Sequence, residues 1–109
     1  AASALRPLAL NFMELLAGSN YEIEAFQLSH DPLHLMDISG RTLSELELGR
    51  RSGAMVLAIR DRGELIANPG GEMRLAPGQL LVVLGSKRQL LTFQELLGEA
   101  VETIETMPG

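Results

Sequence analysis

The stretch "HDPLHLMD", residues 30–37, carries the side chains most able to bind a metal ion. Imidazole nitrogens and carboxylate oxygens are common ligands of divalent metals, so the candidates are His30, Asp31, His34 and Asp37. However, Pro32 interrupts the segment, and no fourth strong ligand is obvious. We therefore expect no tight metal site, and the alternative is a polar loop with surface histidines.

The stretch "LAPGQLLVVLGSKRQLLTF", residues 75–93, has the order strand, glycine, helix with which many phosphate sites begin. A dinucleotide-binding turn needs G-x-G-x-x-G, whereas this turn offers Gly85 alone, and the Walker pattern is absent. Ser86 and Gln89 have the spacing of a helix capping box, which explains both without a ligand. Lys87 and Arg88 could attract an anion beside the helix amides, but we expect them to be solvated.

The chain has no candidate residues for nucleophilic catalysis. There is no cysteine and no G-x-S-x-G pattern around any serine. No set of nucleophile, base and orienting group can be proposed, so we expect no enzyme activity.

Two arginines offer a more specific chemistry. Arg50 and Arg51 end a predicted short helix, where the helix dipole favours cations, and a guanidinium group can hold phosphate or carboxylate with two hydrogen bonds. The alternative is that they pair with surface carboxylates such as Glu47, which contributes little to stability.

Length and composition limit the class of protein. The chain has 109 residues, 46% of them hydrophobic, which suits one domain with a modest core. The absence of cysteine fits a reducing compartment, and the net charge of −5 argues against a nucleic-acid partner. No apolar run approaches the roughly 20 residues that span a bilayer. The start lacks the features of a signal peptide and an initiator Met, so we expect a piece of a longer chain.

Apolar periodicity and turn residues predict the elements that must position these side chains. The first are an amphipathic helix in residues 1–20 and a strand from Tyr21 with a bulge or buried end near Leu28. A short helix capped by Thr42 and Glu45 follows, and then two strands joined by a hairpin at 61–63. The last are a central strand at 79–85 covered on both faces and a final helix after Ser86.

This order predicts an α+β fold, a strand-helix-strand-strand-strand-helix unit with a small, mainly antiparallel sheet. We divide the chain into a crossover and dimerisation helix at 1–20, the compact domain at 21–98, and an acidic tail at 99–109 that frays. The first helix has no partner nearby in the sequence, so we expect it to pack on a second copy.

Residues 38–93 resemble the C-terminal domain of RCK modules, also called the TrkA-C domain. The resemblance extends from Tyr21 to about Leu97, and Gln79 departs from it because the family usually has Asp there. The matching residues are Gly40, Thr42, Leu43, Glu45, Leu46, Gly53, Ile59, Arg60, Gly63, Glu64, Asn68, Pro69, Leu75, Gly78 and Gly85.

The resemblance implies a cytosolic, dimeric regulatory domain of a potassium channel or cation transporter, associated with a membrane complex. In several members the cleft between protomers binds cyclic di-adenosine monophosphate. The positions that correspond to the ligand contacts are Leu43, Glu47, Gly49, Ala54, Met55 and Pro69. Because Gly49, Ala54 and Met55 offer no polar side chain, we expect Arg50 or Arg51 to supply the charge for a nucleotide or another small anionic effector.

Three hypotheses therefore remain open. The first is a ligand-sensing regulatory domain with candidate contacts Leu43, Glu47, Arg50, Arg51, Met55 and Pro69. The second is a purely structural dimerisation module without a ligand of its own. The third and remotest is a metal-dependent enzyme that uses the loop at residues 30–37.

Overall fold

A computed structural model describes residues 14–106 of the chain. Its strands and helices follow in the order β1 (Tyr21–Leu28), η1 (Pro32–Leu35), α2 (Leu43–Leu46), α3 (Leu48–Ser52), β2 (Met55–Asp61), β3 (Glu64–Ala67), β4 (Leu80–Ser86), α4 (Lys87–Leu97), η2 (Gly98–Ala100) and β5 (Val101–Thr106). The elements η1 and η2 are single turns of 3₁₀-helix.

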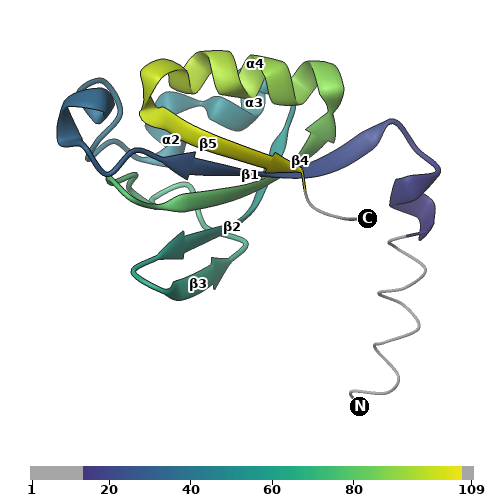
Figure 1. The fold of residues 1–109 in the computed structure, drawn as a ribbon, viewed down its shortest axis with the longest axis horizontal. Helices are drawn as coiled ribbons and strands as arrows, with labels where there is room; N and C mark the ends of the chain where they lie inside the picture. Colours follow the sequence, from purple (N-terminus) through teal and green to yellow (C-terminus); the bar gives the residue numbers. More distant parts are fainter. Residues whose placement is uncertain (1–13, 107–109) are drawn as a thin grey trace.

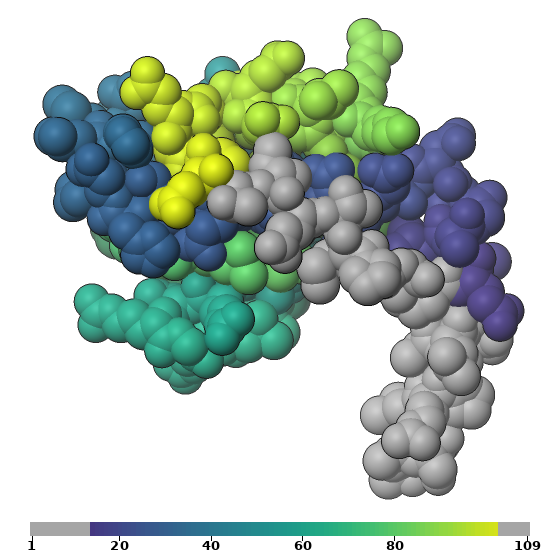
Figure 2. Space-filling view, in the orientation of Figure 1, coloured from purple at the N-terminus to yellow at the C-terminus, as the bar shows by residue number. Residues whose placement is uncertain are grey.

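The strands form one antiparallel sheet with the order β3-β2-β4-β1-β5. Helices α3 and α4 lie over one face of this sheet (Figure 1), and the hairpin of β2 and β3 projects from the body of the domain (Figure 2). The predicted α+β class and its strand-helix order are confirmed.

The hydrophobic core lies between the sheet and α4. Phe26 of β1 and Phe93 of α4 are fully buried, and their ring centroids are 5.2 Å apart. The other fully buried large apolar side chains are Leu28, Leu35, Ile59, Leu75, Leu81, Leu90 and Val83. Two segments distant in the sequence, β1 and α4, are thus joined by the burial of aromatic surface.

The central strand β4 differs from the prediction of a strand covered on both faces. Leu81, Val83 and Gly85 are buried, whereas Leu80, Val82 and Leu84 on the other face are only half-buried. Helices α3 and α4 lie over the opposite face (Figure 1), and among the described residues only the turn at 14–17 approaches this one, where Leu15 and Leu16 line a pocket with Leu84. A strand with apolar residues on both faces can be covered on both by its own protein, or on one face by another molecule. The apolar pattern is the same in both situations, so the sequence cannot distinguish them.

Local turn and cap signals are confirmed. Both capping boxes form, at Thr42 with Glu45 and at Ser86 with Gln89. The hairpin between β2 and β3 places Arg62 at φ 53° and Gly63 at φ 81°, as a two-residue turn with two left-handed positions requires.

The strand β1 ends in the irregularity that its sequence predicts. Its pairing with β5 shifts register between Gln27 and Leu28. Phe26 lies on the same side of the strand as half-exposed Glu24, and Phe26 and Leu28 are both fully buried. The bulge and the buried end therefore both occur.

The C-terminal stretch adds a strand to the edge of the sheet. The stretch 99–109 was expected as a fraying tail, but Val101–Thr106 form β5 and pair with β1. The reason is that β1 offers a free edge whose backbone groups need partners. Of the expected N-terminal helix, residues 1–13 lie outside the described part, and only the turn at 14–17, ending at Gly18, is seen.

Candidate functional site

A cavity of about 630 Å³ opens between the short helices α2 and α3, the start of β2 and the loop after β3. It contains five of the six predicted binding residues. Its lining residues are Leu43, Ser44, Glu47, Gly49, Arg50, Gly53, Ala54, Met55, Val56, Asn68, Pro69 and Gly71. The sixth predicted residue, Arg51, is not among them, and whether these residues bind a ligand stays a prediction.

Backbone hydrogen bonds hold α2 against the loop that follows β3. The N–H of Leu43 donates to the carbonyl of Met73 at 2.9 Å, and the N–H of Ser44 donates to that of Gly71 at 2.9 Å. These amides lie in the first turn of α2, where no intrahelical acceptor exists. Two walls of the cavity, about 25 residues apart in the sequence, are therefore fixed to one another.

The capping box at the start of α2 also sets the charge beside the cavity. The backbone and side-chain hydrogen bonds from Thr42 lower the pKa of the Glu45 carboxyl, because both stabilise the ionised form. Glu45 is exposed and does not line the cavity. It anchors the helix that carries Leu43 and Ser44.

Glu47 divides the predicted single short helix into two. Its φ of 51° and ψ of 35° are left-handed, so it ends α2 and precedes α3. Its N–H donates to the carbonyls of Leu43 and Ser44. Its carboxylate accepts a hydrogen bond from Nη2 of Arg50 at 2.6 Å. The cavity therefore holds one cation and one anion that already pair with each other.

Sequence reasoning missed the polar wall of the cavity. Ser44, Asn68 and Gly71 line it but were not proposed as contacts. Asn68 has φ 48°, and Asn is among the residues that adopt this left-handed conformation most readily. The Asn-Pro-Gly-Gly sequence at 68–71 signals such a turn, although nothing local indicates that it faces α2.

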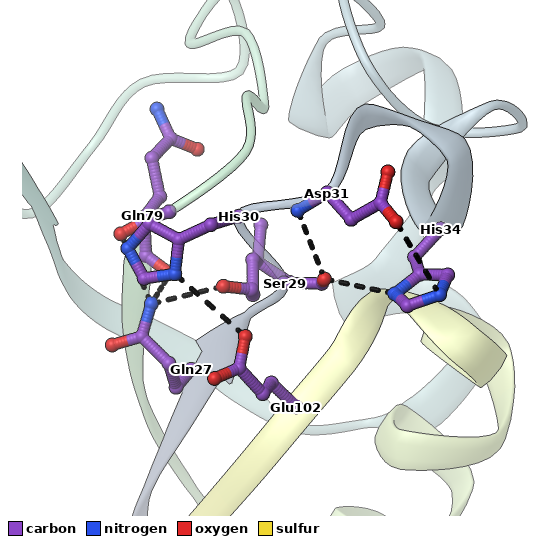
Figure 3. Close-up of polar contacts among 9 residues, drawn as sticks. Gln27, Ser29, His30, Asp31, His34, Gln79 and Glu102 are labelled. Atoms are coloured by element: carbon purple, nitrogen blue, oxygen red, sulfur yellow. Dashed lines mark hydrogen bonds and ion pairs between the residues drawn. The ribbon is translucent and has the colours of Figure 1, made fainter.

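The histidine loop forms polar contacts of its own (Figure 3). Oγ of Ser29 lies 2.9 Å from Nδ1 of His34, whose Nε2 is 3.9 Å from Oδ2 of Asp31. His30 instead lies 3.7 Å from Oε2 of Glu102 on β5. Among residues 14–106 no three His, Cys, Asp or Glu side chains gather as a metal site. The absence of tight metal binding stays a prediction.

An antiparallel sheet covered on one face by α4, with a cavity between its short helices and the loop after β3, defines a small α+β domain. The family model described as the TrkA-C domain matches residues 37–98, more than half of the chain. This chain belongs to the TrkA-C domain family, and the resemblance seen in the sequence is confirmed. No curated protein sequence matches it.

Solved structures share this fold. The RCK C domain of the potassium transport protein KtrA, in complex with cyclic di-adenosine monophosphate, is 20% identical, with a TM-score of 0.66 over 87% of this chain and 98% of that one. The RCK_C dimer of S. agalactiae BusR with the same ligand is 20% identical, with a TM-score of 0.60 over 72% and 93%. At these identities the likeness shows the fold.

A further structure corrects one expectation. BusR of S. agalactiae in complex with its busAB-promoter DNA is 19% identical, with a TM-score of 0.60 over 88% of this chain and 47% of that one. The expectation that the partners include no nucleic acid is therefore wrong. The net charge of −5 is that of these 109 residues alone. It does not exclude a nucleic-acid partner for a protein about twice as long, such as BusR.

The described residues include no helix that is both long and apolar enough to span a membrane.

Proposed function

We propose that this chain is a ligand-sensing regulatory domain that acts as a homodimer in a potassium channel or cation transporter system, on the cytoplasmic side, without catalysing a reaction. The family supports a regulatory role, and the KtrA relative is itself a potassium transport protein. The effector class is a nucleotide or a similar small anion, for which cyclic di-adenosine monophosphate is the first candidate.

One observation carries this proposal. The positions to which the resemblance assigns ligand contacts converge on a single cavity, although they come from three separate segments. They are Leu43, Glu47, Gly49, Ala54, Met55 and Pro69. Leu43 and Pro69 supply apolar surface for a base, and Arg50 supplies positive charge. A cavity with an apolar floor and few polar groups is the usual form of a small-molecule site.

The half-exposed sheet face opposite α4 supports the dimer. Ile23, Leu84 and Met55 are paired neighbours on β1, β4 and β2, so their side chains form one apolar row across three strands. Met55 is 60% exposed and also lines the cavity. A second copy on this face would cover the row and bring the two cavities toward the interface.

Calorimetric titration of the whole chain with cyclic di-adenosine monophosphate tests the proposal, together with a thermal shift screen of other nucleotides. We expect saturable binding with one ligand per two chains and a melting temperature that rises with ligand concentration. Sedimentation should show a dimer at micromolar concentration. Replacing both Arg50 and Arg51 with Ala should remove most of the ligand-induced shift at a given ligand concentration while the protein stays folded.

The same experiments also test the alternative, a purely structural dimerisation module without a ligand of its own. If the chain is dimeric but no nucleotide or anion shifts its melting curve, the domain transmits changes sensed elsewhere. A monomer at micromolar concentration would contradict both readings.

A further inference from the structure

A single basic side chain lines the cavity, and it already forms an ion pair with a carboxylate. Arg50 is the only Lys or Arg among the lining residues. Its Nη2 donates to Oε2 of Glu47 at 2.6 Å, while its side chain stays 78% exposed. An anionic ligand in this cavity therefore meets a guanidinium group that a carboxylate holds and neutralises.

Backbone hydrogen bonds, as well as the ion pair with Arg50, determine where Glu47 lies. Its left-handed conformation is unusual for a residue other than glycine, and hydrogen bonds from its N–H to Leu43 and Ser44 hold it. The three-residue separation from Arg50 then places both side chains on the same side of α3. The backbone of Glu47 is thus fixed beside the cavity by bonds that do not involve Arg50.

We propose that Glu47 is a specificity-determining residue that competes with the ligand for Arg50. This inference rests on the proposed function, namely that the cavity binds an anionic effector. Binding of a phosphate group requires Arg50 to exchange the Glu47 carboxylate for phosphate oxygens, and the ligand must also tolerate the nearby negative charge. The competition selects a ligand whose phosphate takes both arms of the guanidinium while its rings cover Leu43 and Pro69. It disfavours simple monovalent anions.

The strength of the competition sets the expected effect. An exposed ion pair is weak, and the repulsion between two charges near 4 Å in water is of similar size. Together they correspond to about three- to tenfold in affinity. Glu47 therefore adjusts the ligand concentration at which the domain responds without preventing binding.

Calorimetric titration of the whole chain with cyclic di-adenosine monophosphate tests this proposal in four proteins: the wild type, Glu47→Gln, Arg50→Gln and the double variant. Glu95→Gln is the matched control, since it removes the same charge from an exposed position on α4 that lines a different cavity. Glu47→Gly is the second variant, because glycine adopts the left-handed conformation without strain.

We expect Glu47→Gln and Glu47→Gly to bind about three- to tenfold more tightly than the wild type, with Glu95→Gln unchanged. In the Arg50→Gln background the gain should fall to about two- to threefold, because only the repulsion remains. Equal affinity in the wild type and both Glu47 variants would overturn the inference and leave the proposed function intact. Binding only after substitution supports the inference and counts against the ligand proposed for the wild type. Binding by none of these proteins overturns both.

Discussion

The side chain of Gln89 lies against the backbone of Gly53, so that a Cβ added to Gly53 would come within 2.8 Å of Nε2. The same side chain closes the capping box of α4, where its Oε1 accepts a hydrogen bond from the N–H of Ser86 at 2.9 Å. Gly53 immediately precedes Ala54 and Met55 of the cavity. The N-terminus of α4 is therefore a support for the start of β2 and for the site beside it.

Gly53→Ala should destabilise the domain for two reasons. Its φ of 82° is strained for any residue with a Cβ, and the new methyl group would displace Gln89 from its cap. We expect a loss of about 2–3 kcal/mol in the free energy of unfolding, measured by urea denaturation. Gly40→Ala is the matched control, since Gly40 has φ 80° but no atom within 4 Å of the added Cβ. It should lose about 1 kcal/mol, and equal losses would contradict the role of Gln89.

Phe93→Ala should remove a large part of the stability. The ring is fully buried against Phe26, so the substitution loses apolar burial and leaves a cavity between α4 and the sheet. We expect a loss of about 3–5 kcal/mol by urea denaturation. Leu91→Ala on the same helix is the control, because Leu91 is 58% exposed. It should change stability by only about 0.5 kcal/mol, and similar losses in both would refute this account of the core.

Two carboxyl groups should titrate on opposite sides of the usual glutamate range. Burial, with a smaller contribution from the neighbouring Glu22 carboxylate, raises the pKa of Glu24, and the hydrogen bonds from Thr42 lower the pKa of Glu45. A carbon-detected NMR titration of the side-chain carboxyls should resolve both. Thr42→Ala should move the midpoint of Glu45 upward and leave that of Glu24 unchanged, and a midpoint of Glu45 that does not move would count against the capping interaction.

The two shifts affect stability with opposite signs. Because the folded pKa of Glu45 lies below its unfolded pKa, its contribution is present above the unfolded pKa and is lost as the pH falls through the folded one. Glu24 has a folded pKa above the unfolded one, so its ionised form opposes folding at neutral pH, and this cost disappears as the pH falls below the unfolded pKa. Glu24→Gln should therefore raise the melting temperature more at pH 7 than at pH 3.

Deleting residues 101–109 should destabilise the sheet and promote association. The deletion removes β5 and makes β1 an edge strand with unpaired backbone groups. At roughly 1 kcal/mol for each lost ladder hydrogen bond, we expect the free energy of unfolding to fall by about 2–4 kcal/mol. Thermal unfolding and light scattering over a concentration series measure both effects. Deleting residues 107–109 alone is the control, and equal behaviour of the two proteins would show that β5 contributes nothing.

Elements with a local physical cause could be predicted from the sequence. The capping boxes depend on residues three apart, and the hairpin depends on the left-handed positions at Arg62 and Gly63. The strand β5 was missed because its sequence, "VETIET", has no clear alternation of apolar and polar residues. What stabilises it is the free edge of β1, about 75 residues earlier, and no local pattern records that contact.

The candidate site was predictable mainly through family resemblance. Leu43 and Pro69 carry no chemistry that would have selected them alone, and they meet only because α2 docks on the loop after β3. Of the two arginines predicted as ligand contacts, Arg50 lines the cavity and Arg51 does not. A sequence gives the order of residues on a helix, but the break at Glu47 turns α3 away from the direction that one continuous helix would take.

The pairing of β1 with β5 gives the domain a particular response to mechanical load. Glu24 lies opposite Thr106, so the chain enters and leaves the sheet at the same end of two antiparallel strands. Tension between these two points would open their hydrogen bonds one after another from that end, as in a zipper, because the strands are not sheared along their length. Under such tension β5 would detach first, while the layer between α4 and the central strands, with the cavity that it supports, stayed assembled.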